Sequence, residues 1–309
     1  MAGRLGRWEQ VIGVAALVIG GPLLATCSDA DGDLGGRTTL PSTAPIGTPS
    51  STLPTSVEGS VPPTSITGTV PGSLAATTTS VVAALPPISN PGAVVVIDPG
   101  HNGANGANPS EINRLVDAGG FQKACNTTGT AEGGLTESSF NLDLARLVRT
   151  RLEQAGVRVL LTREDDRGWG PCIDERGQVA ARAGADALVS LHADGADAGA
   201  HGFHVIHPTA IAGYTDTTAN ASASLAGDLR DALVETDHTP ATYVGGDGLV
   251  ARGDLGTLNR AGAPAAMVEV GNMHNPGDLD TMTSLDERGR LADALAAGVL
   301  RFLAGEGPG

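Results

Sequence analysis

Hydrophobic positions follow two patterns between residues 93 and 303. The first is a continuous β-branched run, as in Ala93–Asp98, which is typical of a strand buried on both faces. The second begins at Glu137, where apolar residues recur at helical spacing until Gly156 ends the helix. These patterns predict further strands at 157–162, 187–192, 202–207 and 264–270, and further helices at 173–183, 222–235 and 285–303.

The order of these elements predicts the fold class. Strands alternate with helices along the chain, which favours an α/β fold with a mainly parallel sheet. We expect a twisted sheet of about six strands, flanked by helices, within a catalytic domain at residues 92–305. In such sheets, ligand sites lie at the C-terminal ends of the strands.

Residues 28–91 show neither pattern and are rich in Ser, Thr, Pro, Gly and Ala. Such a segment cannot bury enough apolar surface to offset the entropy lost on ordering, so we predict a disordered stalk. Its composition is also that of O-glycosylated stalks.

The N-terminus reads as an export signal. Arg4 and Arg7 precede an apolar run from Val11 to Thr26, and this run is shorter than the roughly 20 residues that span a bilayer. We therefore predict a cleaved signal peptide at residues 1–27, not a permanent anchor helix. The protein would act at the outer face of the cytoplasmic membrane, or in the cell wall or periplasm.

The end of this segment, Leu24-Ala25-Thr26-Cys27, resembles a bacterial lipobox. In such a signal the cysteine becomes lipid-modified and is the first mature residue, so Cys27 would hold the protein on the membrane. Thr26 departs from the small residue usual at its position. The alternative is a secretory signal with an incidental cysteine.

The chain has three cysteines. With Cys27 lipidated, Cys125 and Cys172 remain as a pair outside the cytoplasm, where disulfides persist. A disulfide between them would close a loop of nearly fifty residues and stabilise the fold by roughly 4 kcal/mol in the chain-entropy model. The alternative is two free thiols.

Charge and missing motifs exclude several functions. The 309 residues include 34 acidic and 19 basic side chains, and the net charge of −15 argues against a nucleic-acid partner. The sequence contains no G-x-x-x-x-G-K motif of NTPases and no G-x-S-x-G elbow of serine hydrolases. We expect a monomer.

Three predicted strands end in residues that can carry chemistry. His101 follows the first strand, His192 ends the third, and Glu269 lies near the end of a late strand. The topology brings these strand ends to one edge of the sheet, so the three side chains should lie close together.

Zinc accounts for this set. A catalytic zinc takes three ligands from His and carboxylate groups and leaves a fourth position for water. His101 and His192 supply two ligands, and Glu137 at the start of a helix fits as the third, although it could also be a favourable charge at a helix N-terminus. Glu269 suits the carboxylate that moves the proton of the water. Its alternative is a buried carboxylate paired with an arginine.

From Val94 to Leu303 the chain resembles the zinc-dependent N-acetylmuramoyl-L-alanine amidases of bacterial cell walls. The matching motifs, in order, are Asp98-Pro99-Gly100-His101, Glu137-x-x-x-Asn141-Leu142, Leu161-Thr162-Arg163, Glu175-Arg176, Ala185-Asp186 leading to Ser190-Leu191-His192-Ala193, and Val268-Glu269-Val270-Gly271-Asn272.

The resemblance implies one zinc ion on His101, Glu137 and His192, with Glu269 as the catalytic carboxylate. The substrate would be peptidoglycan or muropeptides, cut at the amide between the lactyl group of muramic acid and the L-alanine of the stem peptide. The motifs also nominate three residues for substrate binding: Arg163, Arg176 and Asn272.

Some positions depart from the family or stand apart from the site. Asp194 occupies a position where the family usually has Asn, and His274 follows Asn272 closely, where we expect it at the surface. The insert at residues 103–130 should form a loop beside the cleft. We expect structural roles for three further histidines, His201, His204 and His207.

Two other functions remain open on the sequence. One is a non-catalytic module that binds peptidoglycan, although all four chemical residues are present. The other is a zinc peptidase that cuts between amino acids of the stem peptide, because its metal chemistry would be the same.

Overall fold

The computed structural model describes residues 92–305. The predicted signal peptide, Cys27 and the stalk lie outside the described residues. No helix in residues 92–305 has the length and apolar character needed to cross a membrane.

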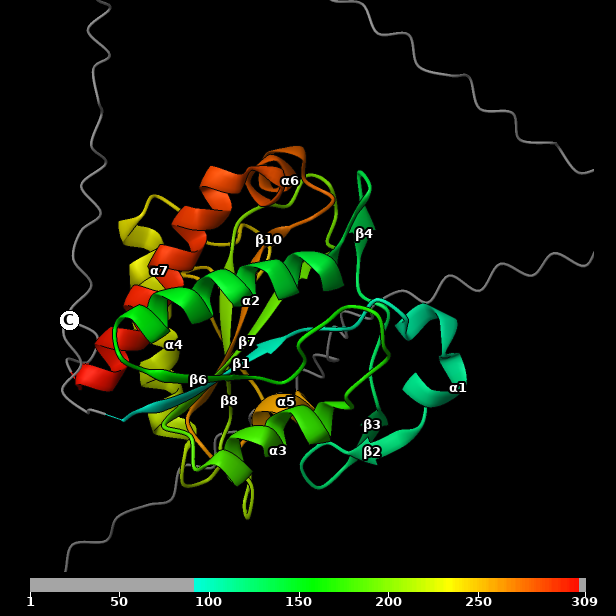
Figure 1. Ribbon diagram of the computed structural model, residues 1–309, viewed down its shortest axis with the longest axis vertical. Helices are drawn as coiled ribbons and strands as arrows, with labels where there is room; N and C mark the ends of the chain where they lie inside the picture. Colours follow the sequence, from blue (N-terminus) through cyan, green and yellow to red (C-terminus); the bar gives the residue numbers. More distant parts are fainter. Residues whose placement is uncertain (1–91, 306–309) are drawn as a thin grey trace, which may run out of the picture. The chain divides into compact units, whose positions relative to one another are not determined.

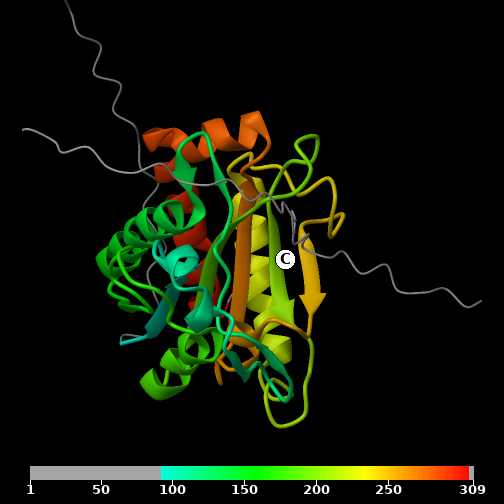
Figure 2. The ribbon, with the colours of Figure 1, turned by 90° about the vertical axis from the view of Figure 1, so that its right-hand side faces the viewer.

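A six-stranded sheet forms the centre of the fold (Figure 1). Its strands, in spatial order, are β6 (Arg158–Leu161), β1 (Val94–Pro99), β7 (Ala187–Asp194), β10 (Ala265–Asn272), β8 (His204–Pro208) and β9 (Leu249–Arg252). The first four are parallel, β8 is antiparallel to β10, and β9 is parallel to β8 (Figure 2). The predicted α/β fold with a mainly parallel sheet of about six strands is confirmed.

Helices cover both faces of the sheet (Figure 1). One face is covered by α2 (Glu137–Gln154), α4 (Ala219–Glu235) and α7 (Leu285–Ala304), and the other by α3 (Ile173–Ala183) and the short α5 (Gly256–Asn259). Consecutive residues of β1 pack on opposite faces of the sheet. Val95 packs towards the first group of helices, and Val96 packs towards the second. The parallel strands are therefore apolar on both faces, which explains their continuous hydrophobic runs.

The helix ends explain why the predicted boundaries are close to the observed ones. Thr136 caps α2 by accepting a hydrogen bond from the Ser139 amide, and Ser284 caps α7 in the same way. Gly184 ends α3 in the left-handed conformation, which glycine adopts without a steric penalty.

The segment between β1 and α2 is more ordered than the predicted loop. It contains the 3-10 turn η1 (Asn105–Ala107), α1 (Pro109–Ile112), a hairpin of β2 (Leu115–Asp117) and β3 (Gln122–Ala124), and a second hairpin of β4 (Ala131–Glu132) and β5 (Leu135–Thr136). A disulfide between Cys125 and Cys172 joins the end of the first hairpin to the start of α3. Asp117 also pairs with Arg260 at 2.6 Å, so the hairpin is tied to the body of the domain.

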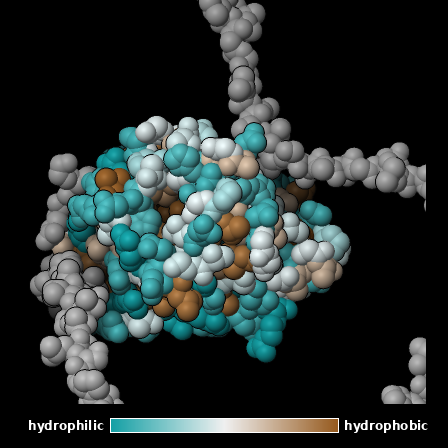
Figure 3. Space-filling view, turned by 90° about the horizontal axis from the view of Figure 1, so that it is seen from above, coloured by the Kyte–Doolittle hydropathy of each residue, from teal (hydrophilic) through white to brown (hydrophobic). Residues whose placement is uncertain are grey.

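Outside this segment, β9, α6 and the short α5 have no counterpart among the predicted elements. The edge strand β9 has four residues, and two of them are exposed, so it lacks the long apolar run of the inner strands. Helix α6 (Pro276–Thr283) has eight residues and buries only Met282. Seen from above α6, the surface is mainly hydrophilic, and its hydrophobic residues form small separate groups (Figure 3).

Candidate metal centre and active site

The turn after β1 brings two histidine rings together. His101 has a φ of +59°, a left-handed conformation that is uncommon for a residue other than glycine. Gly100, just before it, lies against the His192 ring, because a Cβ at this position would be 2.3 Å from that ring. The rings of His101 and His192 meet edge to face, with centroids 4.8 Å apart.

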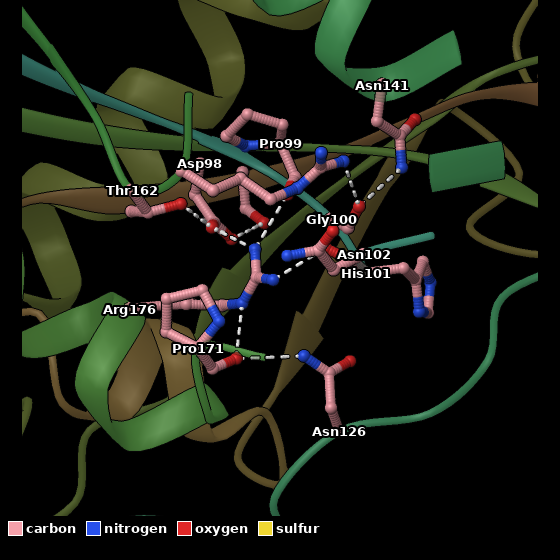
Figure 4. A network of polar contacts seen from close by, with 12 residues as sticks. Asp98, Pro99, Gly100, His101, Asn102, Asn126, Asn141, Thr162, Pro171 and Arg176 are labelled. Atoms are coloured by element: carbon pink, nitrogen blue, oxygen red, sulfur yellow. Dashed lines mark hydrogen bonds and ion pairs between the residues drawn. The ribbon is translucent and has the colours of Figure 1, made fainter. Parts of the chain in front are cut away.

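Two buried arginines hold this turn in place. Arg176 donates to the carbonyl oxygens of Pro99 and His101, both at 2.6 Å (Figure 4). Arg163 donates to the carbonyl oxygens of Pro99 and Gly100 at 2.9 and 3.0 Å. The left-handed turn at His101 is therefore fixed by hydrogen bonds to both of its sides.

Asp98 supplies the negative charge that balances Arg176. Its carboxylate lies 2.7 Å from the Arg176 guanidinium and accepts hydrogen bonds from Thr162 and Ser190. Burial by itself would raise the pKa of Asp98, but Arg176 and the two hydroxyl groups hold that pKa below its ordinary value. Asp98 is therefore ionised and paired at neutral pH.

Glu137 completes a group of three side chains that could hold a metal ion. Its Oε1 atom lies 3.1 Å from His101 Nε2 and 3.0 Å from His192 Nδ1. One ligand atom from each residue lies within 4.8 Å of the other two. Burial would raise the pKa of Glu137, but the neighbouring histidines hold that pKa well below its ordinary range, so the side chain is a carboxylate.

The surroundings of these side chains fit a metal centre. His101 Nδ1 lies 3.1 Å from the carbonyl oxygen of Thr127, which leaves Nε2 directed at the group. The Thr130 amide donates to Glu137 Oε2 at 2.8 Å, so the other carboxylate oxygen is also fixed. Gly129 lies against His101 and Glu137, and a Cβ at this position would be 2.9 Å from the His101 ring. Two His and one Glu are a ligand set of catalytic zinc sites.

Glu269 lies beside this group. It is aligned with His192 in the parallel pairing of β10 and β7, so both side chains project from one face of the sheet. It is half-buried, while the other residues of β10 are buried. The predicted arrangement of His101, His192 and Glu269 at one edge of the sheet therefore agrees with the structure, and Glu137 joins them from the first turn of α2.

Protein families of known description provide a comparison for the whole chain. A family model described as N-acetylmuramoyl-L-alanine amidase matches residues 95–301. The chain belongs to this family. The matched range includes His101, Glu137, His192 and Glu269.

Individual relatives agree with this amidase family. The chain is 41% identical over 240 residues to the N-acetylmuramoyl-L-alanine amidase Rv3717 of Mycobacterium tuberculosis, covering 76% of this chain and 98% of that protein. Among solved structures, the amidase Ami1 of Mycobacterium smegmatis is 40% identical, with a TM-score of 0.66, over 70% of this chain and all of that chain. Ami1 of Mycobacterium abscessus is 43% identical, with a TM-score of 0.65, over 69% of this chain and all of that chain.

The structure shows the surroundings of the three residues that the motifs nominate for substrate binding. The side chains of Arg163, Arg176 and Asn272 are all buried. The two arginines hold the turn at His101. The Asn272 amide donates to the carbonyl oxygens of Asp197 and Ala200, both at 2.8 Å. These residues shape the site from within the fold.

The other histidines of residues 92–305 do not belong to this group of potential ligands. His274 is exposed, as predicted, and His204 is buried. Within residues 92–305, His101, Glu137 and His192 form the one group of three or more side chains whose spacing would suit a metal ion. The close packing of Gly100 and Gly129 against the ligands was not predicted, because a glycine in a loop has no sequence signal beyond its own presence.

Proposed function

We propose that this chain is a zinc-dependent amidase that hydrolyses the bond between N-acetylmuramic acid and L-alanine in peptidoglycan. Membership of the amidase family supports the reaction class. The observation that carries the zinc assignment is the convergence of His101, Glu137 and His192 within 4.8 Å. A site with all three ligands argues against a non-catalytic binding module.

The metal and Glu269 have separate tasks in this proposal. A zinc ion bound by the three ligands would polarise the scissile carbonyl and lower the pKa of a bound water towards about 7. Glu269 accepts the proton of the attacking water and passes it to the nitrogen of the leaving L-alanine. The products are a muramic acid carboxylate and a stem peptide with a free amino terminus.

The buried residues around the ligands keep the site in one geometry. Arg176 and Arg163 fix the backbone on both sides of His101, and Thr127 orients its ring. Such support limits the movement of the ligands during the reaction, which keeps the catalytic geometry constant.

We further propose an exported location for the enzyme. The signal peptide would be cut off just before Cys27, Cys27 would hold the mature protein on the membrane through lipid, and residues 28–91 would serve as the stalk. The enzyme would then reach the wall from the outer face of the membrane as a monomer.

Product analysis tests this function. We expect purified protein to release free L-Ala-D-isoGln from N-acetylmuramoyl-L-Ala-D-isoGln, to stop in the presence of a chelator, and to resume when zinc is added. Mass spectrometry identifies the products. Release of D-isoGln alone would show the zinc peptidase instead. Absence of cleavage by protein that holds one zinc ion would contradict the proposed activity.

A further inference from the structure

Three side chains lie in a row across neighbouring strands beside the metal centre. Glu269 on β10 is aligned with His192 on β7 and with His204 on β8. Side chains at aligned positions of neighbouring strands project from the same face of a sheet. Because His192 belongs to the metal centre, Glu269 lies between the metal centre and His204.

Tyr243 crosses this row. It lies in the segment between α4 and β9, and its hydroxyl donates to Asp194 Oδ2 at 3.0 Å. Its ring also meets the ring of His204 edge to face, with centroids 5.9 Å apart and an interplanar angle of 89°. Asp194 is on β7 and His204 is on β8, with β10 between them. The Tyr243 side chain therefore spans β10 on the face that carries Glu269.

Burial and charge agree with this placement. His204 is only 4% exposed, whereas Tyr243 is half-buried, so the tyrosine forms the outer layer. Burial raises the pKa of Tyr243, and the carboxylates of Asp194 and Glu269 raise it further. The phenol therefore stays protonated and remains a donor to Asp194.

The orientation of the scissile bond places Tyr243 beside the leaving stem peptide. This step rests on the proposed function, in which the scissile carbonyl faces the metal and the scissile nitrogen faces Glu269. The order across the sheet is metal centre, Glu269, then Tyr243 with His204. The first residue of the stem peptide, which carries the leaving nitrogen, then lies next to Tyr243.

We propose that Tyr243 is a specificity-determining residue whose ring forms the apolar wall against the side chain of the first stem-peptide residue. Asp194 fixes the hydroxyl end of the ring, and His204 packs against the ring edge to face. The ring excludes water around the methyl group of L-alanine, so the enzyme prefers L-alanine to glycine at this position.

The test compares two substrates that differ by this methyl group. N-acetylmuramoyl-L-Ala-D-isoGln and N-acetylmuramoyl-Gly-D-isoGln are cleaved by the full-length protein, and kcat/KM is measured for each. We expect the natural protein to prefer L-alanine by about tenfold, since a methyl group in a fitted pocket gives discrimination of this order. Tyr243→Ala should reduce the preference to about twofold or less.

The other tyrosine of the chain provides a matched control. Tyr214 contacts Asp117 of the β2–β3 hairpin and the Arg260 guanidinium, and it takes no part in the row. Tyr214→Ala should leave the preference for L-alanine unchanged. Tyr243→Phe, which keeps the ring, should retain most of the preference.

The outcomes separate this inference from the proposed function. An unchanged preference in zinc-loaded Tyr243→Ala, or no preference in the natural protein, would overturn the role of Tyr243. Failure of the zinc-loaded natural protein to cleave either substrate would count against the proposed function instead. If Tyr243→Ala loses zinc or does not fold, Tyr243→Leu and Tyr243→Phe are compared in its place. Equal ratios of kcat/KM for the two substrates in both variants and in the natural protein would overturn the inference.

A binding measurement provides a second readout without turnover. Calorimetry on Glu269→Gln protein compares the affinities for the two substrates, with and without Tyr243→Ala. We expect the L-alanine substrate to bind more tightly than the glycine substrate only when Tyr243 is present, and equal affinities in both backgrounds would contradict the proposed wall.

Discussion

At the residue scale, the site depends on side chains that approach one another at close range. Glu137 bridges the two histidines, and Glu269 lies beside His192 on the neighbouring strand. In the proposed function, the metal ligands and the carboxylate that moves the proton are separate residues. Their substitutions should therefore have different effects.

Replacing Glu269 should remove turnover and leave the metal in place. Glu269→Gln cannot accept a proton, and general acid–base catalysis contributes about 10²- to 10⁴-fold to rate. We expect kcat to fall by about this factor while zinc content, measured by atomic absorption, stays at one per chain. In contrast, His101→Ala should lose both. A Glu269→Gln protein with undiminished kcat would remove this residue from the mechanism.

Replacing Gly100 should damage the site although no ligand is itself replaced. A methyl group at this position would meet the His192 ring at 2.3 Å, so the ring must move. We expect Gly100→Ala to weaken zinc affinity by about tenfold or more, as does disturbance of the groups that support metal ligands. Competition with a fluorescent chelator measures the affinity. Gly199→Ala is the matched control, since no atom lies within 4 Å of its added Cβ.

At the scale of elements, the β1 turn is held by a buried ion pair. The side chains of Arg176 and Asp98 are 2% and 1% exposed, and Arg176 also donates to three loop carbonyls in addition to Pro99. These contacts connect α3 to the end of β1 and to the loop before α3. The motif residues of the resemblance therefore include positions that build the fold as well as positions that carry chemistry.

Breaking this pair should destabilise the whole domain. Arg176→Met leaves Asp98 buried without its counter-charge, which costs about 3–5 kcal/mol of unfolding free energy. Urea denaturation followed by circular dichroism measures the loss. Arg167→Met is the control, because its side chain is 88% exposed and should change stability by less than about 0.5 kcal/mol. Equal stability of the two variants would contradict the structural role of Arg176.

The elements also show how far the sequence predicts this fold. The inner strands and long helices were predicted because each has a continuous or periodic apolar pattern, as in Val94–Pro99 and Ile173–Ala183. The edge strand β9 and the hairpin of β2 and β3 were not, because short exposed strands are fixed by contacts distant in sequence. The burial of Arg163 and Arg176 was not predicted either, because a motif gives the residue type but not the direction of its side chain.

At the scale of the whole molecule, stability should fall as the solution becomes acidic. Burial, reinforced by Arg252, lowers the pKa of His204 from its ordinary 6.5 to about 4, against a smaller opposite effect of Asp194. Below about pH 6.5 the unfolded chain binds a proton at this histidine and the folded chain does not. The free energy of unfolding therefore decreases between about pH 6.5 and pH 4, by up to about 3 kcal/mol.

His204→Leu tests this dependence. The variant should flatten the decrease in unfolding free energy between about pH 6.5 and pH 4, because no group at this position titrates. His274→Gln, at an exposed position, should keep the natural slope. Urea denaturation at a series of pH values measures both. A natural slope in His204→Leu would show that other groups, such as His238, whose pKa is also lowered by burial, cause the effect.

The proposed function depends on one zinc ion held by His101, Glu137 and His192. The most direct measurement is X-ray diffraction at the zinc absorption edge from crystals of the zinc-loaded protein. We predict one anomalous peak, between His101 Nε2, His192 Nδ1 and the Glu137 carboxylate. A peak at a different group of residues, or no peak in protein that cleaves its substrate, would contradict the claim.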